Sequence, residues 1–205
     1  MRLRQYFEIR GCLICHSFGL LSAQLCSSCT RSLEEIIKST PLIAKGYSSP
    51  IFSLLEWNPK TERIVRPLIH ALKGGTPMPT FEWLAERLVH KYVDFFSRQL
   101  DICYFVPEAN RGRRHAAALA QAINKYGPGK LLSLSTDSAD LRQKSKSKFD
   151  RGSVQFRPLK VEPRSAILVD DIATTGSTLK AMERAISPAQ VVGRCVIATR
   201  VKDVL

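Results

Sequence analysis

Residues 167–179, ILVDDIATTGSTL, constrain the fold of this chain more than any other stretch. Three aliphatic residues predict a buried strand of a parallel sheet, and two adjacent aspartates follow them. The small residues that come next open a helix, so backbone N–H groups at its N-terminus are available to an anion. Gly176 permits a tight turn, and Ser177 or Thr178 is predicted to cap the helix. The two carboxylates can accept hydrogen bonds from neighbouring hydroxyl groups, and the loop beside them can bind an anion. Together they predict a site for a phosphorylated sugar.

Two other interpretations fit part of this stretch. A hydrophobic strand that ends in two acids also occurs in Walker B elements, where an aspartate holds magnesium for a nucleotide triphosphate. That element requires a G-x-x-x-x-G-K-[ST] loop, and none of the eleven glycines supplies one. An ordinary strand, turn and helix with two solvated acids is the remaining alternative.

The charge balance favours an anionic partner. The chain carries 31 Lys and Arg against 18 Asp and Glu, a net charge of +13, which suits nucleic acid, an anionic membrane surface or a phosphorylated ligand. Its 205 residues, 44% hydrophobic and 24% charged, are typical of one soluble domain with room for a small appendage.

The sequence predicts a cytoplasmic protein. No apolar run approaches the roughly 18 to 20 residues that a membrane helix needs. The N-terminus, MRLRQYFEIRGC, has Tyr, Glu and Arg where a signal peptide has its apolar stretch.

Four of the six cysteines form two C-x-x-C pairs separated by ten residues: Cys12 with Cys15, and Cys26 with Cys29. Each pair can supply two thiolate ligands to one metal ion. The two pairs together predict a closed four-thiolate site for structural zinc. Two disulfides are the alternative, which a reducing compartment disfavours. With all four positions filled by protein, the metal is expected to support structure and not chemistry.

The order of the remaining elements predicts an α/β fold. After the cysteines, Ser32 to Glu35 resembles a capping box that opens a short helix. Further helices are expected at residues 61–72 and 80–99, after residue 114 and after residue 178. Strands are expected at residues 51–57, 101–107, 131–135, 154–156, 167–170 and 191–198. Strands that alternate with helices predict a parallel sheet covered on both faces, with the ligand at the carboxyl ends of the strands.

Three basic groups lie outside the 167–179 stretch. Lys73 precedes two glycines at a helix end, where it can be a C-cap residue or an anion ligand. Arg111, Arg113 and Arg114 lie just before a helix, where pyrophosphate or solvent can contact them. Residues 136–151 are rich in Lys and Ser and have hardly any apolar anchor; a lid over a polyphosphate, a strip for nucleic-acid phosphates and a solvated loop are all compatible with them.

The 167–179 stretch resembles the signature of the type I phosphoribosyltransferases, which bind 5-phosphoribosyl 1-pyrophosphate (PRPP). The resemblance implies that Asp170 and Asp171 bind the ribose 2- and 3-hydroxyls. It also implies that the loop binds the 5-phosphate, through Ala173, Thr174, Thr175, Gly176, Ser177 and Thr178. Magnesium would accompany PRPP, and a type I phosphoribosyltransferase-like sheet is the fold expected.

With its cysteine pairs, the whole chain resembles the ComF-type competence proteins, which join a zinc finger to a phosphoribosyltransferase domain. The resemblance implies a finger and connector at residues 1–45 and the second domain at 46–205. It also implies a role in DNA uptake during natural transformation, with single-stranded DNA and the uptake machinery as partners. Where the family has Arg-Gly-Phe-Asn, this chain has Arg-Gly-Arg-Arg at residues 111–114, and Gln143 and Arg151 match the family's lid pattern.

The resemblance assigns candidate roles to the basic groups. Pyrophosphate or lid contacts are expected from Lys73, Arg111, Arg113, Arg114, Gln143 and Arg151. DNA contacts are expected from Lys144, Lys146 and Lys148. Two other functions stay open: a nucleobase salvage or biosynthetic phosphoribosyltransferase, and a nucleic-acid adaptor whose PRPP pocket is vestigial. The sequence identifies neither an acceptor nor a residue that would activate one.

Overall fold

A computed structural model describes the greater part of the chain. The described residues are 11–17, 24–42, 48–74, 78–98, 102–107, 115–127, 129–135, 155–159 and 165–200. No helix within them is long and apolar enough to cross a membrane.

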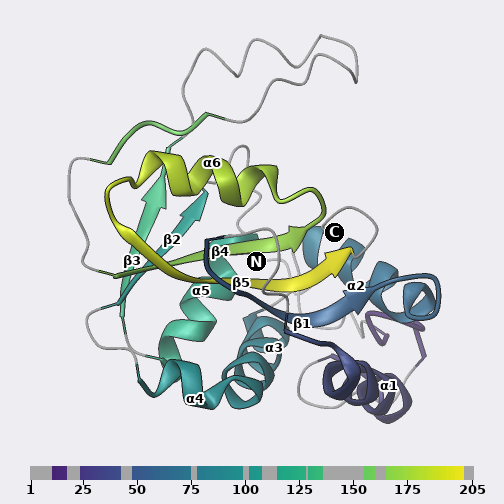
Figure 1. The fold of residues 1–205 in the computed structure, drawn as a ribbon. Helices are drawn as coiled ribbons and strands as arrows, with labels where there is room; N and C mark the ends of the chain where they lie inside the picture. The colour runs from purple at the N-terminus through teal and green to yellow at the C-terminus, as the bar shows by residue number, and fades with distance from the viewer. Residues whose placement is uncertain are drawn as a thin grey trace, which may run out of the picture.

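The core of the fold is a five-stranded sheet in which every neighbouring pair is parallel (Figure 1). The strand order is β1-β5-β4-β2-β3. The strands are β1 (Ile51–Trp57), β2 (Ile102–Pro107), β3 (Lys130–Leu134), β4 (Ser165–Ala173) and β5 (Gln190–Arg200). The predicted α/β class, a parallel sheet flanked by helices with an N-terminal four-cysteine cluster, is confirmed.

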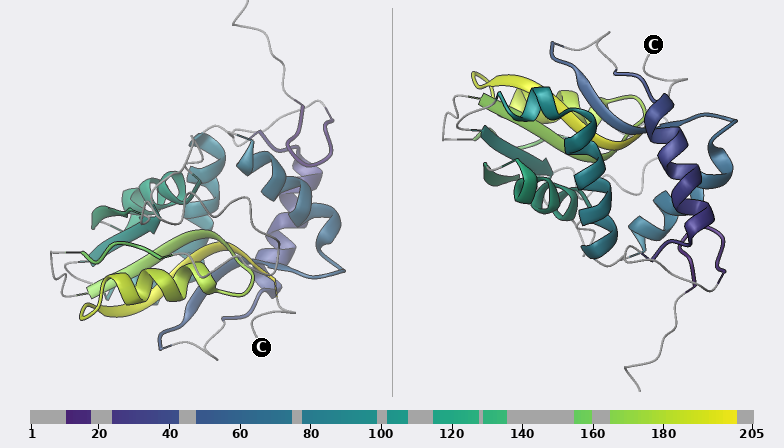
Figure 2. Two further views of the ribbon diagram at one scale, coloured as in Figure 1. Left: turned by 90° about the horizontal axis from the view of Figure 1, so that it is seen from above. Right: turned by 90° about the horizontal axis from the view of Figure 1, so that it is seen from below.

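Helices cover both faces of the sheet. They are α1 (Ser27–Ser39), α2 (Glu62–Lys73), α3 (Met78–Lys91), α4 (Val93–Phe96), α5 (His115–Tyr126) and α6 (Ser177–Ala185). Figures 1 and 2 show α6 on one face, and α1, α3, α4 and α5 on the other.

Alternate residues of the central strand β4 serve the two faces. Ile167 and Val169 belong to the core beneath α3 and α5, whereas Ala166 and Leu168 belong to the core beneath α6. Because successive side chains of a strand point to opposite faces, a strand covered on both sides must be apolar at every position. This requirement explains the unbroken aliphatic run before the two aspartates.

Three predicted elements differ from the structure. The helix predicted over residues 80–99 is broken at Tyr92, whose hydroxyl donates to the Ser53 carbonyl 2.8 Å away and ties the break to β1. The capping box at Ser32 is wrong, because the N-cap of α1 is Cys26, six positions earlier. No strand occurs over the described part of residues 154–156, where Phe156 forms only an isolated bridge.

Helix α1 is held to the rest of the fold by polar contacts along its length. Arg87 of α3 forms an ion pair with Glu34 at 2.6 Å. At the end of α1, Lys91 of α3 donates to the carbonyl of Ile37, and the Thr40 hydroxyl accepts from the backbone N–H of Glu56 in β1. The four-cysteine unit therefore packs against the sheet domain through α1. The division at residue 45 stays a prediction, since residues 43–47 lie outside the described part.

Candidate functional site

The paired acids lie within β4. The strand continues to Ala173, and Asp170 pairs in register with Val196 of β5 while Ala173 pairs with Thr199. Ala173, the first residue of the predicted phosphate loop, is the buried last residue of β4. The turn that follows comprises residues 174–176, and it lies at the carboxyl edge of the sheet, where folds of this class bind ligands.

Lys73, the last residue of α2, reaches this edge. Its Nζ lies 3.8 Å from Oδ2 of Asp171, and both side chains are partly exposed. Lys73 is not the C-cap itself: the C-cap is Gly74, whose backbone N–H donates to the carbonyls of His70 and Ala71, each at 3.0 Å. The lysine thus ends its helix and also contributes a cation to the acid pair.

Asp170 is almost fully buried. Burial raises the pKa of its carboxyl group well above the ordinary value, and the nearby charge of Asp171 raises it further. The two acids are also ordered by the backbone: the N–H of Asp171 donates to Oδ1 of Asp170 at 2.9 Å, and the N–H of Ile172 donates to Oδ1 of Asp171 at 2.8 Å. A buried carboxyl and a neighbouring carboxylate, both fixed in position, are suited to hold a ligand with adjacent hydroxyl groups.

The N-terminus of α6 has no side-chain cap. Its N-cap is Gly176, with a left-handed φ of 68°, and no side chain caps the helix there. The prediction that Ser177 or Thr178 caps the helix is therefore wrong. The hydroxyl groups of Thr175 and Ser177 lie 3.2 Å apart. An uncapped helix of nine residues leaves backbone donors at its first turn, and these favour an anion.

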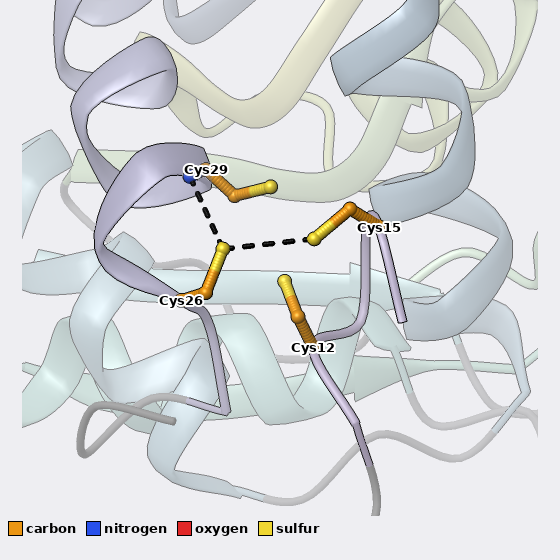
Figure 3. A group of neighbouring side chains, drawn as sticks. All are labelled: Cys12, Cys15, Cys26 and Cys29. Carbon is orange, nitrogen blue, oxygen red and sulfur yellow. Dashed lines mark hydrogen bonds between the residues drawn. The ribbon is translucent and has the colours of Figure 1, made fainter. Parts of the chain in front are cut away.

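The four cysteines of the two C-x-x-C pairs converge, as Figure 3 shows. All four Sγ atoms lie within 4.8 Å of one another, and those of Cys15 and Cys26 are 3.6 Å apart. Zinc bound to sulfur at about 2.3 Å in a tetrahedron places the sulfurs about 3.8 Å apart, so the cluster fits this ion. The thiols are free and not paired as disulfides.

Local structure prepares some of these thiols to act as ligands. The Sγ of Cys26 accepts the backbone N–H of Cys29 at 3.5 Å, and this bond is the main reason that the pKa of Cys26 falls to about 6. The bond also caps α1. Hydrogen bonding to Ser17 lowers the pKa of Cys15, whereas burial raises that of Cys29. The metal would supply the positive charge that lets all four ionise together.

The other predicted contacts lie outside the described residues. They are Arg111, Arg113, Arg114, Gln143, Lys144, Lys146, Lys148 and Arg151. One feature that the sequence reasoning missed is the outer side of α2, where exposed basic residues recur at helical spacing up to Lys73. Their separation by three or four positions was the signal that could have identified them.

Fold and site together define a parallel α/β protein with an acid pair and an uncapped helix at the carboxyl edge of its sheet, joined to a four-thiol cluster that could hold a metal ion. No protein-family model and no curated protein matches the chain. Solved structures similar to it include a hypoxanthine phosphoribosyltransferase from Staphylococcus aureus. In its orthorhombic crystal form, identity is 13% over 62% of this chain and 67% of that chain, with a TM-score of 0.40.

The tetragonal form of that enzyme gives 14% identity over 60% of this chain and 65% of that one, with a TM-score of 0.39. A purine phosphoribosyltransferase from Pyrococcus horikoshii gives 18% identity over 58% of this chain and 67% of that one, with a TM-score of 0.32.

Proposed function

We propose that this chain is a cytoplasmic PRPP-binding protein of the phosphoribosyltransferase class, with structural zinc in the four-thiol cluster. The observation that carries the proposal is the meeting of Lys73 with Asp171, beside the buried Asp170 and the uncapped start of α6. One site thus offers acceptors for two ribose hydroxyls, backbone donors for a 5-phosphate and a cation for a pyrophosphate oxygen.

The chemistry that such a site supports is displacement at C1 of the ribose. The bond from C1 to the pyrophosphate oxygen breaks as the acceptor forms its own bond to C1. Magnesium, when bound with PRPP, would neutralise charge on the pyrophosphate. Asp170 and Asp171 would hold the ribose still, while Lys73 would stabilise charge on the leaving group.

Calorimetry with PRPP tests the ribose site. The metal-replete chain is expected to bind PRPP saturably and more tightly with magnesium. Replacing Asp170 and Asp171 together by Ala is expected to abolish that binding, while Asp94→Ala, an exposed acid on α4, leaves it intact. Unchanged affinity in the double variant would refute the assignment. Pyrophosphate release, measured against a panel of bases and single-stranded DNA, then distinguishes a transferase from a binding protein.

The resemblance to ComF-type proteins supports a role with incoming single-stranded DNA and the uptake machinery. Natural transformation in cells that carry the Asp170→Ala, Asp171→Ala chain is the corresponding test. If PRPP binding is lost and transformation persists, the pocket is dispensable for that role. If PRPP is bound and pyrophosphate is released with a nucleobase but not with DNA, the salvage alternative replaces this proposal.

A further inference from the structure

The outer side of α2 carries a row of basic residues. Arg63, Arg66, His70 and Lys73 are separated by three, four and three positions, which places them along one side of the helix. All four are exposed. The opposite side is buried through Val65, Leu68, Ile69 and Leu72. We call these four exposed residues the α2 basic row.

Few acids neutralise the α2 basic row. Glu62 is the one acidic residue of α2, and it contacts Arg66 at 3.3 Å in an exposed pair of the kind that stabilises little. Among the residues that the structure describes, neither Arg63 nor His70 forms an ion pair. The guanidinium group of Arg63 is therefore available to an anion from outside the molecule, and that of Arg66 is held only by its one exposed pair with Glu62.

The row leads to the acid pair. At the start of α2, the Thr61 hydroxyl donates to the Glu56 carbonyl at 2.6 Å, which fixes the helix to the end of β1. At its end, Lys73 lies beside Asp171. The ten residue-to-residue steps from Arg63 to Lys73 extend about 15 Å at 1.5 Å per step. Figure 1 shows α2 at the arrowhead ends of β1 and β5, near the carboxyl edge of the sheet.

We propose that the α2 basic row binds the sugar-phosphate backbone of a single-stranded nucleic acid and directs the end of the strand to Asp170 and Asp171. A linear row of cations follows a chain of phosphates, and an unpaired terminal nucleotide suits a site for one ribose. The part of this proposal that brings the end of the nucleic acid to Asp170 and Asp171 rests on the proposed function. The contact between the sugar-phosphate backbone and α2 is independent of that function.

The surroundings of the row favour a nucleic acid over a membrane surface. A helix that lies on a membrane inserts apolar side chains beside its basic ones. The large exposed hydrophobic residues among those described are Leu42, Met78, Val93 and Tyr126, and none belongs to α2. The row therefore offers charge without an apolar anchor.

Fluorescence anisotropy with a labelled oligothymidine of about 20 nucleotides tests the surface. In the variant Arg63→Gln, Arg66→Gln, affinity at low salt is expected to fall about tenfold. The slope of log K against log salt is expected to become shallower by about 1.4, which is about 0.7 for each phosphate that the variant no longer neutralises. The matched control is Arg98→Gln, Lys130→Gln, which removes the same charge from exposed positions near the amino ends of β2 and β3.

The control pair is expected to keep wild-type affinity and slope. Equal losses in both pairs would mean that net charge alone attracts the strand and would overturn the proposal, as would an unchanged affinity in the α2 pair.

PRPP calorimetry on the same proteins separates this inference from the proposed function. A selective loss of oligothymidine binding in the α2 pair, with PRPP binding retained, supports both. If the wild type binds no PRPP while the α2 pair still selectively loses oligothymidine binding, the surface stands and the proposed function fails. If PRPP binds and the α2 pair holds the strand as the wild type does, the proposed function stands and this inference fails.

Discussion

Lys73 and Asp171 come from distant parts of the chain and meet at 3.8 Å. Lys73→Gln keeps most of the side-chain length and removes the charge. PRPP affinity is expected to fall about tenfold, as for the loss of one hydrogen bond to a charged group. Calorimetry measures the change, with Lys130→Gln as the matched control at the start of β3. Equal affinity in the two variants would show that Lys73 does not contact the ligand.

The buried carboxyl of Asp170 gives the protein a pH dependence of known sign. Its pKa in the folded state is raised to about 8 by burial and by Asp171, so the folded state holds a proton that the unfolded chain releases near pH 4. The contribution of Asp170 to the stability of the folded state is fully present below pH 4 and is lost as the pH rises toward 8.

Asp170→Asn removes this dependence. Relative to wild type, the variant is expected to gain stability between pH 5 and pH 8, and by more than about 1.4 kcal/mol, the equivalent of one pKa unit. Urea unfolding at the two pH values measures the difference, and Asp94→Asn is the exposed control. A variant that tracks the wild type at both pH values would contradict the assigned shift.

At the scale of elements, α1 depends on one of the four clustered cysteines for its first turn, since Cys26 is its N-cap. Cys26→Ser is expected to lower zinc content from about one per chain and to reduce the Tm by more than about 4 °C. Because Ser is itself a favoured N-cap residue, the cap is expected to persist in this variant, and the fall in Tm is expected to come from loss of the metal; about 1 kcal/mol corresponds to about 2–4 °C in a domain of this size.

Metal analysis and thermal melting of Cys26→Ser measure the two effects. Cys103→Ser is the control, because this thiol lies in β2 outside the cluster. Full zinc content in Cys26→Ser would remove Cys26 from the ligand set.

At the scale of the molecule, one buried arginine joins three segments. Arg194 of β5 is fully buried; it donates to the Ser49 carbonyl and pairs with Glu183 of α6 at 2.7 Å. Arg194→Met is expected to destabilise the fold by about 2 kcal/mol, because the buried Ser49 carbonyl loses its charged donor; the Glu183 side chain is 33% exposed and can be solvated. Chemical denaturation measures the loss of unfolding free energy. The control is Arg184→Met, which removes an exposed arginine from α6, next to Glu183. A change under about 0.5 kcal/mol would show that the pair is dispensable.

The sequence predicted those parts of the fold that follow from local pattern. The strand before Asp170 was identified because both its faces are buried, and the four cysteines because their spacing suits one metal. The break at Tyr92 was missed, since it depends on a bond to β1 that no local pattern contains. The N-cap of α1 was missed because a thiol took the role usually given to Ser, Thr, Asp or Asn.

The site was predicted only in part, because some of its contacts join residues that are far apart in the sequence. Asp170 and Asp171 are adjacent in sequence, so their pairing could be foreseen, whereas the approach of Lys73 depends on how α2 packs over the sheet. Arg194 attracted no prediction, because a charged residue inside a strand gives no sign of the partner that will accept it in the core.

The strand order sets the schedule on which the protein can assemble during synthesis. Edge strand β1 bonds only to β5 in the described sheet, and 133 positions separate Trp57 from Gln190. At roughly 5–20 residues per second, β1 leaves the ribosome about 7 to 27 s before its partner has been made. During that interval its apolar residues have no neighbouring strand, so we expect them to stay exposed and prone to aggregation until β5 has been made. The four-cysteine cluster ends at Cys29, so all its thiols are made long before the strands of the sheet are complete.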